Sequence, residues 1–271
     1  MKKTMILLCS VAASLIFFGI GVSMAETLRV ATECTYPPFN YRTADGELRG
    51  YDIDVAKGVA TLIGADIEFV CQKWDGMIPG LLADKFDLIV ASLSITEERK
   101  TKIDFSVPYR VSIGRFIGRK GSGFKPFNAD NSVNVAAFKN IKVGLSRAST
   151  YDNWFQAKAP DANVLRYESD DAMYLDLENG RVDVIMTNPM KSYISFLSQP
   201  SGSGFEFIGP QVLDEKFFGV GVGIGLRKGN EALLKRIDGA IKSLTENGSL
   251  EKYSHKYFPF AIHPEKWAGV Q

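Results

Sequence analysis

Short apolar runs and amphipathic stretches alternate along this chain of 271 residues. The apolar runs at 28–32, 66–70 and 87–91 predict strands, and apolar side chains at helical spacing predict helices over 55–63 and 74–83. This strand–helix–strand–helix–strand order predicts a parallel, doubly wound sheet, because parallel neighbours need a crossover connection.

A second run of the same kind follows a loop rich in Gly, Asn and Pro. Its expected elements are a crossing strand at 111–119, strands at 142–145, 163–167 and 182–186, and helices at 149–157 and 169–179. The last expected elements, which should return to the first run, are a glycine-alternating strand at 217–226 and helices at 230–247 and 250–257.

The sequence therefore predicts an α/β fold of two doubly wound lobes joined by a two-segment hinge. Lobe 1 would comprise residues 26–111 and 218–271, and lobe 2 would comprise residues 112–217. The carboxyl ends of the strands would face a cleft between the lobes, where ligands bind in open α/β sheets.

Residues 1–25 have the layout of an export signal. Two lysines precede an apolar stretch at 5–22, and Ser23 and Ala25 supply small residues at a cleavage site. An uncleaved membrane anchor is the alternative. Cleavage would change the formal net charge from +1 to −1, because two lysines and no acid are removed. A near-neutral chain without a basic run predicts no nucleic-acid or membrane-surface partner.

Two cysteines remain after the signal, Cys34 and Cys71, each just past a predicted strand. If those strands are parallel neighbours, the thiols could lie close together, and export would permit a disulfide. Two buried free thiols are the preferred prediction, with the disulfide as the alternative. Besides these cysteines only His255 and His263 are available, and this placement predicts no metal site.

The segment 87–99 combines a strand end with an expected helix start. The apolar run stops at Ser92 and Ser94; Ser94 and Glu97 stand at capping-box spacing, and Arg99 follows in the first turn. Hydroxyls, free helix N–H groups and a guanidinium together can form a carboxylate receptor. The alternative is an ordinary capped helix with a solvated arginine.

Four further loops follow predicted strand ends. Glu33 and Tyr36 lie in a loop stiffened by two prolines, and Trp74 stands at a strand-to-helix turn, where its ring can stack on a guanidinium. The second run contributes the other two loops. One carries Arg147 and an expected helix N-cap at Ser149 or Thr150, and the other carries the side-chain amide of Asn188. Each residue alone has a structural explanation, as a solvated or packed side chain, but five loops at strand ends favour a binding cleft.

Catalysis would need more groups than this cleft supplies. The chain has no Gly-x-Ser-x-Gly elbow, Walker loop or catalytic-cysteine context, and neither histidine falls in a candidate loop. Glu33 could act as an acid or base, but no second catalytic group accompanies it. We therefore expect no catalytic residue and no cofactor.

Six motifs occur in order along the chain: Thr35-Tyr-Pro-Pro-Phe, Gly50-Tyr-Asp-Ile-Asp, Trp74-Asp-Gly-Met-Ile-Pro, Ser92-Leu-Ser-Ile-Thr-x-x-Arg, Ile103-Asp-Phe-Ser and Tyr253-x-x-Lys-Tyr-Phe. Together they resemble the polar amino-acid periplasmic binding proteins of bacterial ABC importers, and most closely the lysine/arginine/ornithine-, histidine- and opine-binding group. The resemblance implies a hinged receptor of type II periplasmic-binding-protein fold, monomeric and periplasmic, that delivers its ligand to an inner-membrane ABC permease. The alternatives are an enzyme on the same scaffold, such as a dehydratase, and a sensory or interaction module.

The resemblance also implies roles for the residues at the amino-acid end of a ligand. Arg99 would bind the α-carboxylate, assisted by Ser94 and by the helix end that carries Thr150. Ser92 would help to hold the α-ammonium group.

At the other end, Tyr36 and Trp74 would enclose the ligand side chain, and Glu33 would meet its distal cationic group. Two positions depart from the basic amino-acid binders: Asn188 replaces an aspartate that pairs with the α-ammonium, and Arg147 also differs. The opine binders resemble this chain at Asn188, and their ligands carry a substituted α-nitrogen and a second carboxylate. Arg147 would either bind that second carboxylate or be a solvated side chain. The expected ligand is a cationic amino acid of the arginine, lysine, ornithine or histidine type, or an opine-like derivative.

Overall fold

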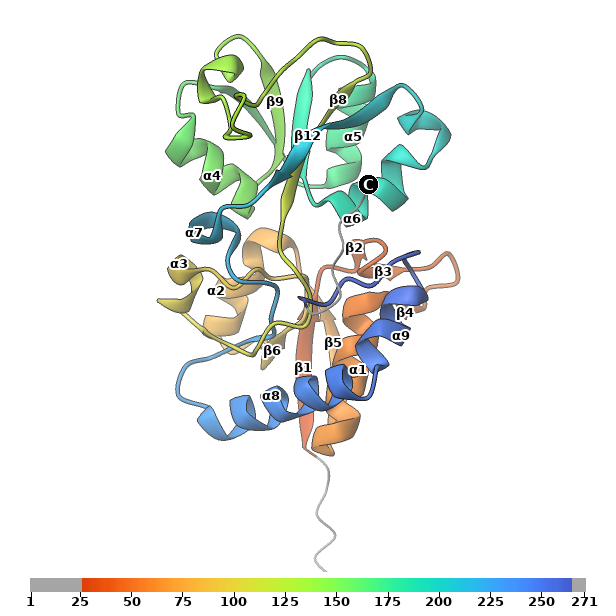
Figure 1. Ribbon diagram of the computed structural model, residues 1–271. Helices are drawn as coiled ribbons and strands as arrows, with labels where there is room; N and C mark the ends of the chain where they lie inside the picture. Colours follow the sequence, from red (N-terminus) through yellow and green to blue (C-terminus); the bar gives the residue numbers. More distant parts are fainter. Residues whose placement is uncertain (1–25, 265–271) are drawn as a thin grey trace, which may run out of the picture.

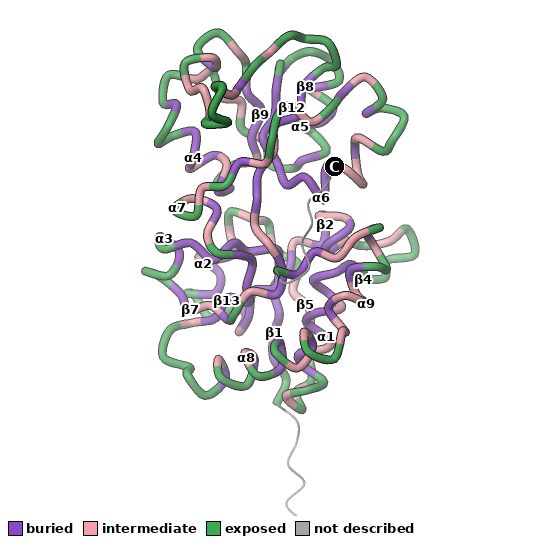
Figure 2. The backbone as a smooth tube through the Cα atoms, in the orientation of Figure 1, coloured by how far each residue is buried: buried purple, intermediate pink, exposed green. Residues whose placement is uncertain are grey.

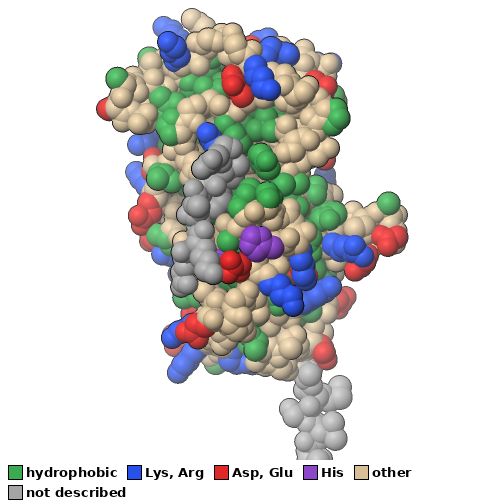
Figure 3. Space-filling model, turned by 45° about the vertical axis from the view of Figure 1, so that its right-hand side comes forward, with side chains coloured by type: hydrophobic (Ala, Val, Ile, Leu, Met, Phe, Trp, Pro, Cys, Tyr) green, Lys and Arg blue, Asp and Glu red, His purple; other side chains and the backbone are tan. Residues whose placement is uncertain are grey.

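The computed structural model describes residues 26–264 and consists of two α/β lobes joined by two crossing segments (Figure 1). The predicted export signal lies outside the described residues. Figure 2 shows buried backbone running through both lobes and through the connection between them. On the face shown in Figure 3, basic and acidic side chains are mixed, and hydrophobic side chains gather near the middle of the molecule. Within 26–264, no helix is long and apolar enough to cross a membrane.

The sheet of the first lobe is mixed rather than wholly parallel. Its strand order is β5-β1-β6-β13-β7. These strands are β1 (Thr27–Thr32), β5 (Asp66–Cys71), β6 (Leu88–Ile89), β7 (Asp104–Phe105) and β13 (Gly225–Leu226). β1 is parallel to β5 and β6, whereas β13 pairs antiparallel with β6 and β7, which brings the chain back to this lobe as expected.

Helices and a small antiparallel sheet complete the first lobe. The sheet consists of β2 (Thr35–Tyr36), β3 (Asn40–Arg42) and β4 (Leu48–Arg49); the helical elements are α1 (Tyr51–Ile63), η1 (Trp74–Gly76), α2 (Met77–Leu82), α3 (Glu97–Lys100), α8 (Glu231–Glu246) and α9 (Ser249–His255). Helix α8 is amphipathic: Leu233, Ile237, Ile241 and Leu244 are buried against the core. Each such side chain contributes about 1.5–3 kcal/mol by leaving water.

The second lobe has the sheet order β10-β9-β11-β8-β12. These strands are β8 (Gly114–Arg119), β9 (Lys142–Ser146), β10 (Asn163–Tyr167), β11 (Val184–Thr187) and β12 (Phe205–Val212); the helical elements are η2 (Val135–Phe138), α4 (Thr150–Lys158), α5 (Asp170–Glu178), α6 (Pro189–Ser192), η3 (Tyr193–Leu197), η4 (Pro200–Gly202) and α7 (Glu215–Phe218). The parallel strands β10, β9 and β11 end toward the first lobe, next to helices α4 and α6 (Figure 1). The exact lobe limits, at 111/112 and 217/218, remain predictions.

The two crossing segments run antiparallel and are hydrogen-bonded to each other. The amide of Tyr109 donates to the carbonyl of Val222 at 2.9 Å, and the amide of Val222 donates to the carbonyl of Arg110 at 2.9 Å. A Cβ on Gly221 would lie 2.9 Å from the carbonyl oxygen of Arg110, and Gly221 has φ +146°. The glycine-rich stretch therefore allows close backbone packing. The prediction of a single strand at 217–226 is wrong, because this range contains the end of α7 and an isolated bridge at Val222 before the short β13.

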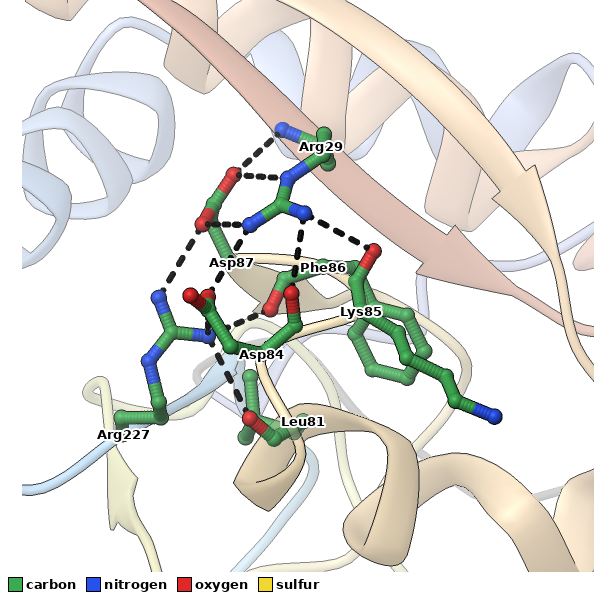
Figure 4. Close-up of polar contacts among 7 residues, drawn as sticks. All are labelled: Arg29, Leu81, Asp84, Lys85, Phe86, Asp87 and Arg227. Atoms are coloured by element: carbon green, nitrogen blue, oxygen red, sulfur yellow. Dashed lines mark hydrogen bonds and ion pairs between the residues drawn. The ribbon is translucent and has the colours of Figure 1, made fainter.

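A charge cluster at the edge of the first lobe ties β1, β6 and β13 together (Figure 4). The two oxygens of Asp87 accept from Nε and Nη2 of Arg29 at 3.1 and 2.9 Å, and Oδ1 also accepts from Nη2 of Arg227 at 3.0 Å. The hydrogen bonds from Arg29 are the main reason that the pKa of Asp87 falls to about 2.

We expect the Asp87→Asn variant to lose about 1–2 kcal/mol of unfolding free energy at pH 7, after allowance for solvent screening. A carboxylate whose pKa is depressed on folding stabilises above its unfolded pKa, so the difference from wild type should shrink as pH falls from 4 to 2. Urea unfolding at several pH values measures this. Asp84→Asn, at an exposed position of the same cluster, is the matched control with a smaller expected effect. A stability difference for Asp87→Asn that does not change with pH would contradict this account.

Candidate ligand-binding site

A cavity of about 480 Å³ lies between the two lobes, with walls from both. All ten residues predicted to bind a ligand line it: Glu33, Tyr36, Trp74, Ser92, Ser94, Arg99, Arg147, Ser149, Thr150 and Asn188. They come together because the parallel strands of each lobe end at this cleft.

Arg99 is buried in the cavity wall, and no carboxylate within residues 26–264 forms an ion pair with it. Its Nη1 donates to the carbonyl of Ser94 at 3.0 Å, and its guanidinium carbon lies 5.3 Å from the centre of the Trp74 ring. Burial lowers the pKa of Arg99 to about 10, a sign that the free protein does not compensate its charge fully. The Trp74 ring therefore stacks on a guanidinium of the protein itself, that of Arg99.

The predicted capping box of Ser94 and Glu97 is wrong. Thr96 is the N-cap of α3, and its hydroxyl accepts from the amide of Arg99 at 3.3 Å. Ser94 instead forms a bridge to Val222, and its hydroxyl shares a 2.8 Å hydrogen bond with that of Ser112 in the first crossing segment. Ser94 therefore connects the Arg99 region to the hinge.

Ser92 connects the cavity to a buried carboxylate that sequence reasoning missed. Its backbone is left-handed, with φ 56°, and its hydroxyl donates to Asp52 at 2.8 Å. Asp52 also accepts from the Asn40 amide and the Tyr109 hydroxyl, both at 2.8 Å. The Gly50-Tyr-Asp motif had marked this position, but the long-range contact could not be read from it.

Helix α4 brings its N-terminus to the cavity, and Ser149 is its N-cap. The Ser149 hydroxyl accepts from the amide of Asp152 at 3.2 Å, while Thr150 opens the helix. Across the cleft, the indole N–H of Trp74 donates to the carbonyl of Ala148 at 3.2 Å. The two lobes therefore contact each other over the cavity.

Glu33 faces a buried pair of opposite charges, Asp170 and Lys191. The ammonium of Lys191, only 1% exposed, lies 3.7 Å from Asp170, and its nitrogen is 5.1 Å from the centre of the Tyr36 ring. Burial, together with the charge of Asp170, raises the pKa of Glu33 to about 7, against the opposing effect of Lys191. Glu33 can therefore change its charge near neutral pH.

The two positions that depart from the basic amino-acid binders have structural partners. The side-chain oxygen of Asn188 accepts from the amides of Met190 and Lys191 at 2.9 and 3.2 Å and so caps α6. Arg147 is half exposed, and its Nη1 lies 3.4 Å from Glu168, which also approaches Lys73 at 3.6 Å. Arg147 thus belongs to an ion-pair group that spans both lobes.

Cys34 and Cys71 form a disulfide, so the preferred prediction of two buried free thiols is wrong. Strands β1 and β5 are parallel neighbours with Thr32 opposite Cys71, and the left-handed turn at Cys34 leaves the two Cα atoms 5.6 Å apart. Cys71 is also exposed rather than buried. The bridge anchors the loop of Glu33 and Tyr36 to the end of β5.

Removing this bridge should lower the unfolding free energy by about 3–4 kcal/mol, because it closes a loop of 37 residues. The measurement is urea unfolding of the Cys34→Ser/Cys71→Ser double variant beside the oxidised wild type. Wild type treated with reductant is the control and should approach the double variant. Identical unfolding curves for all three proteins would contradict the assignment.

Several cavity residues were not predicted. Arg110 and Ser112 belong to the first crossing segment, and Asp170 opens α5 after β10. The rule that residues after strand ends line the cleft would have found Asp170. The crossing segment carries no such signal, because it lines the cavity only through the way the lobes meet. Among the described residues no group of acids, histidines and cysteines could hold a metal ion.

Two α/β lobes with a two-segment hinge and a cavity between them define a type II periplasmic binding protein. The chain belongs to the bacterial extracellular solute-binding proteins, family 3, whose profile matches residues 28–260. The predicted fold class and family are thereby confirmed.

Similar proteins place the chain among binding proteins rather than enzymes. It is 35% identical over 240 residues to an L-arginine-binding protein of Pseudomonas aeruginosa, with 88% of this chain and 90% of the relative covered. It is also 35% identical over 265 residues to the histidine-binding periplasmic protein of Salmonella typhimurium, covering 97% and 99%. The solved structure of an ancestral arginine-binding protein bound to arginine has TM-score 0.76 and 33% identity, covering 87% of this chain and 99% of that one. These relatives support a non-enzymatic role, and the dehydratase-like alternative is not favoured.

Proposed function

We propose that this protein captures a cationic amino acid, or an opine-like derivative of one, in the interlobe cavity. Arg99 binds the α-carboxylate with help from Ser94, Ser149 and Thr150, and Ser92 holds the α-nitrogen. The observation that carries the proposal is the buried guanidinium of Arg99, which has no ion-pair partner among the described residues, in a cavity lined by both lobes. A carboxylate supplies the charge-assisted hydrogen bonds that this group lacks.

The remaining cavity residues surround the rest of the ligand. Tyr36 and Trp74 contribute aromatic faces for the side chain, and Glu33 provides an anion for its distal cationic group. Asn188 and Arg147 form part of the second-lobe wall of the cavity. Relatives that are named for arginine and histidine binding fit this assignment.

The same relatives support the cellular role. We propose that the mature protein acts as a monomer in the periplasm after cleavage near Ala25, and that it delivers its ligand to an inner-membrane ABC permease. The relative from Salmonella typhimurium is named as periplasmic. We expect the two lobes to close over the bound ligand. The permease would then recognise this closed, ligand-bound form.

A thermal-shift panel tests the ligand class. The panel comprises arginine, lysine, ornithine, histidine, octopine and nopaline, with glutamate as the acidic control. A ligand that binds only the folded state raises the melting temperature by mass action. We expect a rise with at least one cationic amino acid or opine and none with glutamate. No rise with any of the six would contradict the proposed ligand class.

A further inference from the structure

Arg110 is a second buried guanidinium in the wall of the cavity. It is 2% exposed and lies in the first crossing segment, with its guanidinium carbon 4.4 Å from the centre of the Phe39 ring. Its Nη1 donates to the carbonyl of Val111 at 2.8 Å, while its buried Nε has no hydrogen-bond partner in the described part of the chain. Within 26–264, no carboxylate comes within ion-pair distance of it. A buried charge without a counter-ion is costly, so an anion that reaches Arg110 would gain a strong interaction.

The other cations at the cavity already have acidic partners. Lys73 and Arg147 both approach Glu168, and Lys191 approaches Asp170. Apart from the exposed Asp75, three charged groups of the wall have no ion pair within residues 26–264: Arg99, Arg110 and Glu33. Charge complementarity to them calls for a ligand with two anionic groups and one cationic group.

Arg99 and Arg110 both lie near a pair of hydrogen-bonded serines on the hinge side of the cavity. The carbonyl of Ser94 accepts from Arg99, and the hydroxyl of Ser94 bonds to that of Ser112 at 2.8 Å. Ser112 lies two residues beyond Arg110, and both line the cavity. The two anionic groups should therefore belong to one end of the ligand, whereas its cation belongs at Glu33.

We propose that Arg110 binds a second ligand carboxylate, carried by a substituent on the α-nitrogen, and so selects an N-carboxyalkyl amino acid over its parent amino acid. This inference rests on the proposed function, in which Arg99 holds the α-carboxylate. It assigns the second carboxylate to Arg110 rather than to Arg147, which is half exposed and paired with Glu168. Asn188 fits the same ligand, because a substituted α-nitrogen has fewer N–H groups to offer an acidic partner.

Calorimetric titration with L-arginine and with octopine, which is arginine bearing a 1-carboxyethyl group on its α-nitrogen, tests the proposal. We expect wild type to bind octopine at least about tenfold more tightly than arginine. In the Arg110→Gln variant, octopine affinity should fall at least about 30-fold, because a buried charge pair is lost, while arginine affinity changes less than about threefold. Arg115→Gln is the matched control: Arg115 is five residues further along the chain, stacks 4.2 Å from the Phe207 ring and does not line the cavity. It should leave both affinities unchanged.

Three results would overturn the proposal. The first is an equal loss of both ligands in Arg110→Gln, which would give Arg110 a role common to all ligands. The second is a selective loss of octopine in Arg147→Gln but not in Arg110→Gln, and the third is tighter binding of arginine than octopine by wild type. None of these three results affects the proposed function. That function would be contradicted only if wild type bound neither arginine nor octopine nor any other ligand of the thermal-shift panel. If Arg110→Gln does not fold, Arg110→Lys decides by the same selective loss, since an ammonium cannot make the planar two-bond contact with a carboxylate.

Discussion

An Arg99→Ala variant is expected to keep its fold and to lose at least about 100-fold in ligand affinity. The guanidinium is buried, and its one hydrogen bond within residues 26–264 goes to the carbonyl of Ser94. Its lowered pKa shows that burial without a counter-ion disfavours the charged form. Removal should therefore cost the free protein little stability, whereas the bound ligand would lose charge-assisted hydrogen bonds and leave a buried carboxylate unpaired.

Calorimetry gives the affinity, and thermal unfolding without ligand gives the stability of the fold. Lys100→Ala is the matched control, because Lys100 lies on the same helix and forms a largely exposed pair with Glu97. We expect its affinity and melting temperature to equal those of wild type. Unchanged affinity in Arg99→Ala would contradict the proposal that Arg99 binds the ligand carboxylate. Unfolding of the ligand-free variant would show that the role of Arg99 is mainly structural.

The second large effect concerns pH and Glu33. Its pKa of about 7 in the free protein means that the carboxyl is mostly protonated at pH 6 and mostly ionised at pH 8. A cationic ligand binds the ionised form, so the observed affinity for arginine should rise about tenfold between these pH values. The sign for folding is opposite: because the folded pKa lies above the usual value of 4.5, the stability of the ligand-free fold falls as pH rises from about 4.5 to about 7.

Calorimetric titrations at pH 6, 7 and 8 measure this dependence. In buffers of different ionisation enthalpy, binding at pH 6 should release a proton from Glu33. The Glu33→Gln variant should bind arginine about 10- to 100-fold more weakly at pH 8 and show no comparable slope. An equally steep rise of affinity in Glu33→Gln would assign the titration to another group.

Local sequence rules predicted the strand-end loops well. Glu33, Trp74, Ser92 and Asn188 each follow a strand, and parallel strands of one sheet end on one side, so their meeting in a cleft follows from the topology. The sequence does not distinguish the capping residue of α3, because Ser94 and Thr96 both precede the helix and both carry hydroxyls. Only the bridge between Ser94 and Val222 removes Ser94 from the helix.

Contacts that depend on strand register or on how the lobes meet could not be predicted from the sequence. The disulfide needs Thr32 to stand opposite Cys71, which the apolar runs alone do not specify. The pairing of Lys191 with Asp170 joins the start of α6 to the start of α5. The place of Arg110 in the cavity wall could not be predicted either, because it follows from the packing of two chain segments that lie far apart in sequence.

Two crystal structures, one of the protein crystallised with arginine and one with octopine, would show whether Arg99 holds the ligand carboxylate in the cavity between the lobes. We predict ligand density in the cavity between the lobes, with the α-carboxylate within hydrogen-bond distance of the Arg99 guanidinium and the distal guanidinium facing Glu33. An empty cavity at saturating ligand, or a ligand bound with its carboxylate away from Arg99, would contradict the account.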